Sequence, residues 1–211
     1  MRIRSVLVSG LVGVSAFSRV AVQHSRTVGF RRFCSVVPPE EPPPTAPLTE
    51  LSRLEIRTGK VLEVSVHPEA DGLFVEKIDV GEEEGPRTIV SGLVGFCKEE
   101  DLLNRDVVVL CNLKPRALKG ITSAGMLLCS SNDDHSQVEP LAPPAGVPPG
   151  ELVTFEGHLA APIAPGNRAV KAYGKIADDL SVDDEGRAMY QDIPFMTSGG
   201  PCTSGLKGSI S

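Results

Sequence analysis

The sequence is short of the residues and spacings that mark metal centres and enzyme active sites. Its five cysteines are few and odd in number, and no two have C-x-x-C spacing, so neither a disulfide framework nor a zinc site is predicted. None of the four histidines belongs to an H-x-x-H or H-E-x-x-H motif, and the sequence has no G-x-x-x-x-G-K-S/T phosphate loop. We therefore predict no catalytic residues, no metal and no cofactor.

Long apolar runs are also missing. The longest one, at residues 6–17, is interrupted by glycine and serine and is shorter than the roughly 20 apolar residues that a membrane helix needs. We therefore predict a protein that does not associate with a membrane.

Acidic residues are absent from residues 1–39, although the whole chain carries a net charge of −6 from 21 Lys+Arg and 27 Asp+Glu. The six arginines of this segment leave 15 basic residues against 27 acidic ones, or −12, for the remainder. An arginine-rich, acid-free N-terminus is typical of organelle transit peptides, so we predict one over residues 1–37. Arg32-Phe33-Cys34-Ser35 is similar to a mitochondrial processing site, which favours the mitochondrion. A plastid address and a tail without any address are the alternatives.

The remainder begins with a proline-rich linker at 38–48, because six prolines within ten residues favour an extended spacer. Beyond it, alternating or continuous apolar residues predict strands at 56–66, 73–80, 87–90, 106–113, 125–129 and 151–155, with a short helix at 98–103. In the first strand the even-numbered positions form the apolar face, and Gly59 is the expected bulge or bend. This pattern predicts an all-β fold, a five-stranded Greek-key barrel over residues 49–156. Residues 157–211 are too few for a core of their own, so this extension should pack on the barrel or be disordered.

One stretch departs from the acidic background. Between Leu102 and Asn132 there are four basic residues and a single acid, Asp106. Lys114, Arg116 and Lys119 fall within six residues of a loop that joins two apolar strands, which predicts a local phosphate-binding site. Arg57 and Lys77 have the outward parity of the first two strands and are expected to extend this patch. The alternative is an ordinary solvated loop.

The aromatic residues indicate which kind of nucleic acid suits such a patch. Single-strand binders of this barrel class stack bases on exposed aromatic rings, but Phe74 has the apolar parity of its strand and should face the core. Recognition of a folded RNA through its backbone and shape is therefore favoured.

The same residues carry a family resemblance, in the segments 54–61, 67–71, 73–81, 87–93, 107–115 and 123–129. They resemble the tRNA-binding domain of endothelial monocyte-activating polypeptide II, which also occurs at the C-termini of bacterial methionyl- and animal tyrosyl-tRNA synthetases. The resemblance covers residues 51–156 densely and continues more weakly to the end of the chain.

The resemblance implies an oligonucleotide-binding (OB) fold that holds tRNA without strong sequence preference and aids aminoacylation. Its Asn-Leu-Lys-Pro loop and Ser-x-Gly-Met segment are linked to tRNA binding in the family. These positions, with the neighbouring bases, are Asn112, Lys114, Arg116, Lys119, Ser123 and Met126. Thr122 and Ala124 stand where the family commonly has Lys and Glu, so the loop is less basic here. The extension at 157–211 resembles one that mimics a second subunit in longer members, which implies a monomer.

Together these features predict a non-catalytic, tRNA-binding protein that assists an organellar methionyl- or other aminoacyl-tRNA synthetase. The alternative is a protein-interaction module that docks on a synthetase through its acidic surface and tail, with RNA binding incidental.

Overall fold

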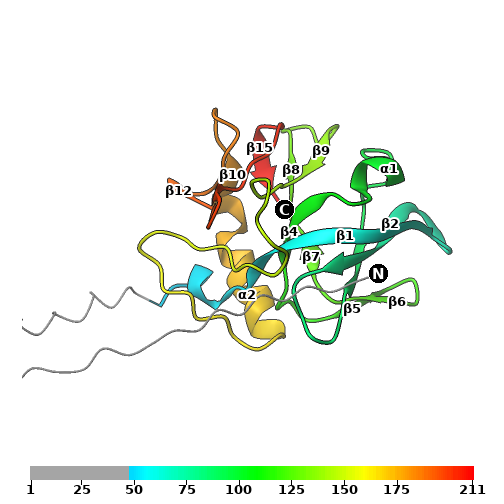
Figure 1. The fold of residues 1–211 in the computed structure, drawn as a ribbon, viewed down its shortest axis with the longest axis horizontal. Coiled ribbons are helices and arrows are strands. Elements are labelled where there is room, and N and C mark those ends of the chain that lie inside the picture. Colours follow the sequence, from blue (N-terminus) through cyan, green and yellow to red (C-terminus); the bar gives the residue numbers. More distant parts are fainter. Residues whose placement is uncertain (1–47) are drawn as a thin grey trace, which may run out of the picture. The chain divides into compact units, whose positions relative to one another are not determined.

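The computed structural model describes residues 48–211, and the predicted transit peptide and nearly all of the predicted linker lie outside this range. The described chain is mostly β-strand, in agreement with the all-β prediction (Figure 1). Within it, no helix is long and apolar enough to cross a membrane.

The strands and helices are β1 (Ile56–His67), β2 (Ala70–Asp79), β3 (Arg87–Ser91), α1 (Glu99–Leu102), β4 (Asp106–Leu110), β5 (Arg116–Leu118), β6 (Ile121–Ser123), β7 (Met126–Leu127), β8 (Cys129–Ser131), β9 (Val138–Pro140), α2 (Asn167–Ile176), β10 (Leu180–Val182), β11 (Ala188–Tyr190), β12 (Ile193–Pro194), β13 (Met196–Thr197), β14 (Gly200–Pro201) and β15 (Gly208–Ile210).

A five-stranded antiparallel sheet with the order β3-β2-β1-β4-β7 forms the first part of the fold. The segment before β7 approaches the other end of this sheet, because the Ala124 N–H donates to the Thr88 carbonyl of β3 at 2.9 Å. Most of the side chains that the strands enclose are apolar, with Val61, Ile78, Ile89 and Val107 all fully buried.

The first strand does not keep one apolar face along its whole length. The register with β2 shifts between Val61 and Glu63 and again between Val66 and His67, so neither irregularity falls at Gly59. Val61 is buried, whereas Leu62 is 41% exposed, so the predicted parity is reversed at these two positions. Gly59 is required for a different reason: a Cβ there would lie 2.9 Å from the Ile78 Cγ2.

The extension packs on the rest of the fold by sharing a sheet and a core with it. The second sheet has the order β12-β11-β10-β15-β8-β9, so β15 of the extension pairs directly with β8. Leu54, Ile56 and Leu110 lie in one hydrophobic cluster with Ala172 and Phe195 of the extension. Burial of this shared apolar surface orders a segment that is too small to fold alone.

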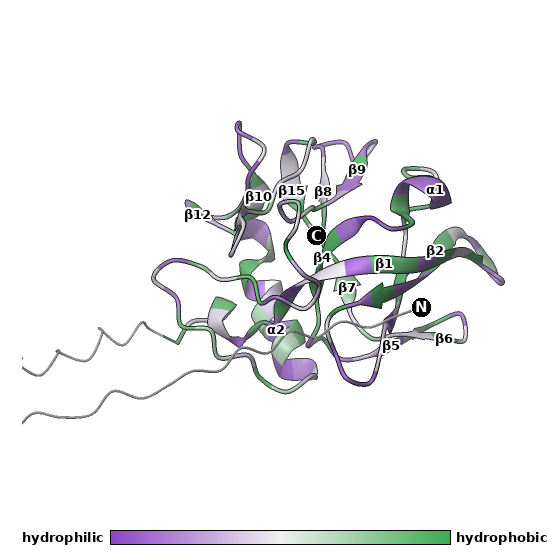
Figure 2. Cartoon of the chain, viewed as in Figure 1, coloured by the Kyte–Doolittle hydropathy of each residue, from purple (hydrophilic) through white to green (hydrophobic). Residues whose placement is uncertain are grey.

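Two local predictions at the junction were wrong. Residues 151–155 do not form a regular strand, because Leu152 and Thr154 make only isolated bridges to Arg57 and Met196. The ten-residue helix α2 was not predicted at all. It buries the small side chains of Ala169 and Ala172 together with Ile176, and Figure 2 shows both hydrophobic and hydrophilic residues along it.

Candidate nucleic-acid interface

The loop predicted at 112–120 is largely a β-hairpin, formed by β5 and β6, which projects beside the main sheet (Figure 1). Leu118 pairs with Ile121, so only Lys119 and Gly120 make the turn. Both have positive φ, 46° and 88°, which is the geometry of a type I′ turn. The turn places Lys119 at the tip of the hairpin, whereas Lys114 and Arg116 lie toward its base.

Lys114, Arg116 and Lys119 are exposed, and none of them has an ion-pair or hydrogen-bond partner among residues 48–211. Most other basic side chains of the described chain are neutralised by a carboxylate. Those with such a partner are Arg53, Arg57, Lys60, Arg87, Lys98, Arg105, Lys175, Arg187 and Lys207. The hairpin therefore presents positive charge that no internal partner cancels, and it suits a phosphate backbone.

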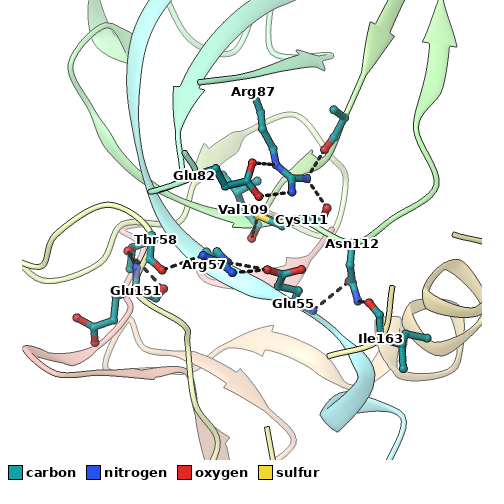
Figure 3. A network of polar contacts seen from close by, with 12 residues as sticks. Glu55, Arg57, Thr58, Glu82, Arg87, Val109, Cys111, Asn112, Glu151 and Ile163 are labelled. Atoms are coloured by element: carbon teal, nitrogen blue, oxygen red, sulfur yellow. Dashed lines mark hydrogen bonds and ion pairs between the residues drawn. The ribbon is translucent and has the colours of Figure 1, made fainter. Parts of the chain in front are cut away.

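The two ends of the segment that carries the hairpin are held together by Arg87 on β3 (Figure 3). Its Nη1 donates to the carbonyl oxygen of Cys111 and, at 2.7 Å, to that of Ala124. Its Nε donates to Glu82 at 2.7 Å. The hydrogen bond from Arg87 lowers the pKa of Glu82, and the reciprocal interaction raises the pKa of the guanidinium, so both groups stay charged. Arg87 was not among the predicted site residues.

Asn112 is fully buried and cannot offer its side chain to an RNA in this conformation. Its Nδ2 donates to the carbonyls of Arg53 and Ile163 at 2.8 and 2.9 Å, and its Oδ1 accepts from the Glu55 N–H at 3.0 Å (Figure 3). All of its hydrogen-bonding groups thus have partners, so the predicted role as a direct contact is corrected to one of positioning the start of the loop.

Ser123 and Met126 are also held inside the structure. The Ser123 hydroxyl accepts from the Val90 N–H and donates to the Gly125 carbonyl, both at 3.0 Å, and its side chain is buried. Met126 is half-buried against the hydrophobic core. Ser123 therefore fixes the end of the hairpin to β3, and Met126 packs against the core.

Arg57 and Lys77 do not share the outward face that was predicted for both. Lys77 lies on the outer face of β2, next to the buried Ile78, whereas Arg57 lies on the face of β1 that carries Gly59 and is turned toward Ile78. Arg57 Nη2 lies 2.6 Å from Glu55 Oε1, so a carboxylate neutralises it (Figure 3). Lys77 Nζ donates to the Thr88 hydroxyl at 2.8 Å and has no carboxylate partner within the described part of the chain. Lys77 is the better candidate of the two for extending a cationic surface.

The end of β1 is tied to the hairpin by His67, the last residue of this strand. His67 is buried, and its Nδ1 accepts from the Glu69 N–H at 3.0 Å. The proton of a neutral ring is then on Nε2, which donates to the Leu118 carbonyl at 3.1 Å.

No group of metal-ligating side chains occurs among residues 48–211. Burial raises the pKa of the Cys202 thiol to about 12, so this cysteine is a thiol at neutral pH.

Sequence reasoning missed a buried carboxyl group, Glu76, which is fully buried on the inner side of β2. Its Oε1 accepts from the Ser91 hydroxyl at 2.8 Å, and Oε2 has no hydrogen-bond partner in the described structure. Burial raises the pKa of this group from 4.5 to about 7. The alternation of β2 indicates this burial, because position 76 lies on the same face of the strand as the buried Phe74 and Ile78.

Comparison with known proteins identifies the family to which this fold belongs. Residues 56–152 match the family described as "Putative tRNA binding domain". The solved C-terminal domain of Plasmodium vivax p43 is similar over 78% of this chain and 100% of that domain, with 39% sequence identity and a TM-score of 0.69. The chain therefore belongs to the tRNA-binding domain family of endothelial monocyte-activating polypeptide II and the synthetase C-terminal domains.

Two curated relatives show the setting of this domain in larger proteins. A probable methionine–tRNA ligase of Oryza sativa subsp. japonica is 49% identical over 152 residues, which are 72% of this chain and 19% of the ligase. The aminoacyl tRNA synthase complex-interacting multifunctional protein 1 of Cricetulus griseus is 42% identical over 150 residues, 71% of this chain and 41% of that protein. The chain thus matches well under half the length of each of these relatives. Its tRNA-binding domain is of a kind associated with aminoacyl-tRNA synthetases and their accessory proteins.

Proposed function

We propose that this protein holds tRNA through the phosphate contacts of Lys114, Arg116 and Lys119 and assists an aminoacyl-tRNA synthetase without catalysing a step itself. The observation that carries the proposal is the set of three exposed cations without internal partners on one hairpin, in a chain whose other basic side chains are mostly ion-paired. Arg87, Asn112 and Ser123 hold the base of this hairpin, which keeps the cations in a defined arrangement.

The binding part of the proposal is tested by titrating tRNA with the purified protein over a series of salt concentrations. Binding through phosphates releases counterions, so log affinity should fall linearly with log salt, by about 0.7–0.9 for each phosphate contact. Affinity that does not depend on salt would contradict a phosphate-binding hairpin.

The assisting role is tested by adding the protein to a synthetase and measuring the rate of aminoacylation at limiting tRNA. Stimulation that is lost with the hairpin cations supports the proposal. The alternative is a module that docks on a synthetase directly. Retention of a synthetase after nuclease treatment, by a protein that binds no tRNA, would establish this alternative.

The proposed place of action is an organelle, first the mitochondrion and otherwise the plastid, with a methionyl- or other organellar synthetase as the partner. The support is the acid-free, arginine-rich segment at residues 1–39. Sequencing the N-terminus of the protein recovered from fractionated organelles tests this, since a chain that still begins at residue 1 in the cytosolic fraction would contradict it.

We also propose that the protein is a monomer, because the strands of its own extension cover β8 and pack against the core. Light scattering of the purified protein should give a mass near 22.3 kDa for the full chain, and a mass of twice this value would contradict the proposal.

A further inference from the structure

The extension contains a second acid-free segment. Residues 157–177 hold no Asp or Glu, and neither do residues 107–132, which include the hairpin. Both occur in a body with 27 acidic residues against 15 basic ones. The basic residues of the second segment are Arg168, Lys171 and Lys175, all on α2.

The fold brings these two segments together. Leu113 forms a parallel bridge with Gly166, directly before α2, and the Gly166 N–H donates to the Asn112 carbonyl at 3.2 Å. The side chain of Asn112 also donates to the Ile163 carbonyl at 2.9 Å. The start of α2 is therefore fixed beside the residue that precedes Lys114, although the two are more than 50 positions apart in the sequence.

The basic residues of α2 share one exposed face. Arg168, Lys171 and Lys175 are three and seven positions apart, which places them along one stripe of a helix. The helix packs on the core through Ala169, Ala172 and Ile176, so this stripe faces solvent. Lys175 forms an ion pair with Glu50 at 2.6 Å, whereas Arg168 and Lys171 have no ion-pair or hydrogen-bond partner in the part of the chain that the structure describes.

We infer that Arg168 and Lys171 of α2 continue the tRNA-binding surface of the hairpin and contact further phosphates of the same tRNA. This rests on the proposed function of the hairpin. The basic side chains of residues 48–211 that have no protein partner are Lys114, Arg116, Lys119, Arg168 and Lys171, and the Leu113–Gly166 bridge joins the two elements that carry them. A row of separate, solvated cations suits the repeated phosphates of an RNA backbone, in which each phosphate meets one side chain. The extension would then have a binding role in addition to its structural one.

The test is the salt dependence of tRNA binding by the full chain and by the double variant Arg168→Gln/Lys171→Gln. Glutamine keeps the length and helix propensity of these exposed positions while removing the charge. Loss of two phosphate contacts should lower the slope of log affinity against log salt by about 1.4–1.8. The charge-preserving variant Arg168→Lys/Lys171→Arg should keep most of the wild-type slope.

The matched control is Lys98→Gln/Lys207→Gln, which removes the same charge from cations that are paired with Glu100 and Asp184. Its slope should stay close to that of the wild type. If the α2 variant has the slope of the control or of the wild type while Lys114→Gln/Arg116→Gln lowers it, the hairpin binds tRNA and the inference about α2 is wrong. If the wild type itself shows no salt-dependent binding, the proposed function fails and the inference fails with it. Thermal unfolding of each variant verifies that the fold is retained.

Discussion

The β5–β6 hairpin and the strands β1 and β2 both carry basic residues, yet these residues differ in how far their charges are already paired. On the hairpin Lys114, Arg116 and Lys119 have no partner within the described residues, whereas Arg57 on β1 is neutralised by Glu55. A carboxylate beside a cation cancels much of its positive potential, so the pair attracts a phosphate less than a lone cation does. The comparison indicates that the pairing of basic residues, and not their number, distinguishes the proposed binding surface in this acidic protein.

The largest effect should come from removing the hairpin charges together. The triple variant Lys114→Gln/Arg116→Gln/Lys119→Gln loses three phosphate contacts, so the slope of log affinity against log salt should fall by about 2–3. Its thermal stability should stay close to that of the wild type, because these side chains are exposed and unpartnered. Titration with tRNA and a melting curve check the two halves of this prediction.

Asn112→Ala should show how strongly the hairpin depends on its support. The substitution leaves the Glu55 N–H and the carbonyls of Arg53 and Ile163 without their buried partner. We expect a loss of about 3 kcal/mol in the free energy of unfolding, and weaker tRNA binding at temperatures where the protein is still folded. Urea denaturation measures the first effect. A stable variant with normal tRNA affinity would contradict the positioning role.

The inner side of β2 differs from its outer side in its response to pH. Burial raises the pKa of Glu76 to about 7 from 4.5, so the folded protein binds this proton more tightly than the unfolded chain does. The free energy of unfolding should therefore fall as the pH rises from about 4.5 to about 7, by up to about 3 kcal/mol from this group. Glu76→Gln should remove this part of the pH dependence. Urea denaturation of both proteins at pH 5 and pH 8 tests this. If the free energy of unfolding changed equally with pH in the two proteins, Glu76 would not titrate in this way.

The smallest effect on binding should come from Arg57→Gln. Because Glu55 already neutralises Arg57, we expect tRNA affinity to change less than twofold and stability to fall by about 0.5–1 kcal/mol. Lys77→Gln is the useful comparison, because Lys77 donates only to the Thr88 hydroxyl. This variant should lose more tRNA affinity than Arg57→Gln. If the Arg57 variant bound tRNA as weakly as the hairpin triple variant, the distinction between paired and unpaired cations would be wrong.

The sequence was sufficient for much of the fold, because strands such as β2 alternate clearly between polar and apolar residues. The hairpin was missed as regular structure because β5 and β6 have only three residues each and little apolar contrast. Helix α2 was missed because its buried face consists largely of alanines, which carry a weak hydrophobic signal. Both elements are defined by their tertiary contacts more than by local pattern.

The charged residues of the candidate site were predictable from the sequence, but the buried hydrogen bonds that hold the hairpin in place were not. Lys114, Arg116 and Lys119 were identifiable from an acid-poor stretch, and their exposure agrees with that interpretation. The roles of Asn112 and Ser123 depend on Ile163 and Val90, which are distant in sequence, so no local pattern could reveal them. The ion pair of Arg57 was predictable from the sequence, since Glu55 is two residues away and residues two apart in an extended chain point to the same side.

The central claim, that unpaired cations and not basic residues in general bind tRNA, is tested most directly by two triple variants in one salt series. One removes Lys114, Arg116 and Lys119, and the other removes the ion-paired Lys60, Lys98 and Lys207, each by substitution with glutamine. Both variants change the net charge equally. We predict that the first lowers the slope of log affinity against log salt by about 2–3, while the second leaves it near the wild-type value. Equal slopes for the two variants would contradict the claim.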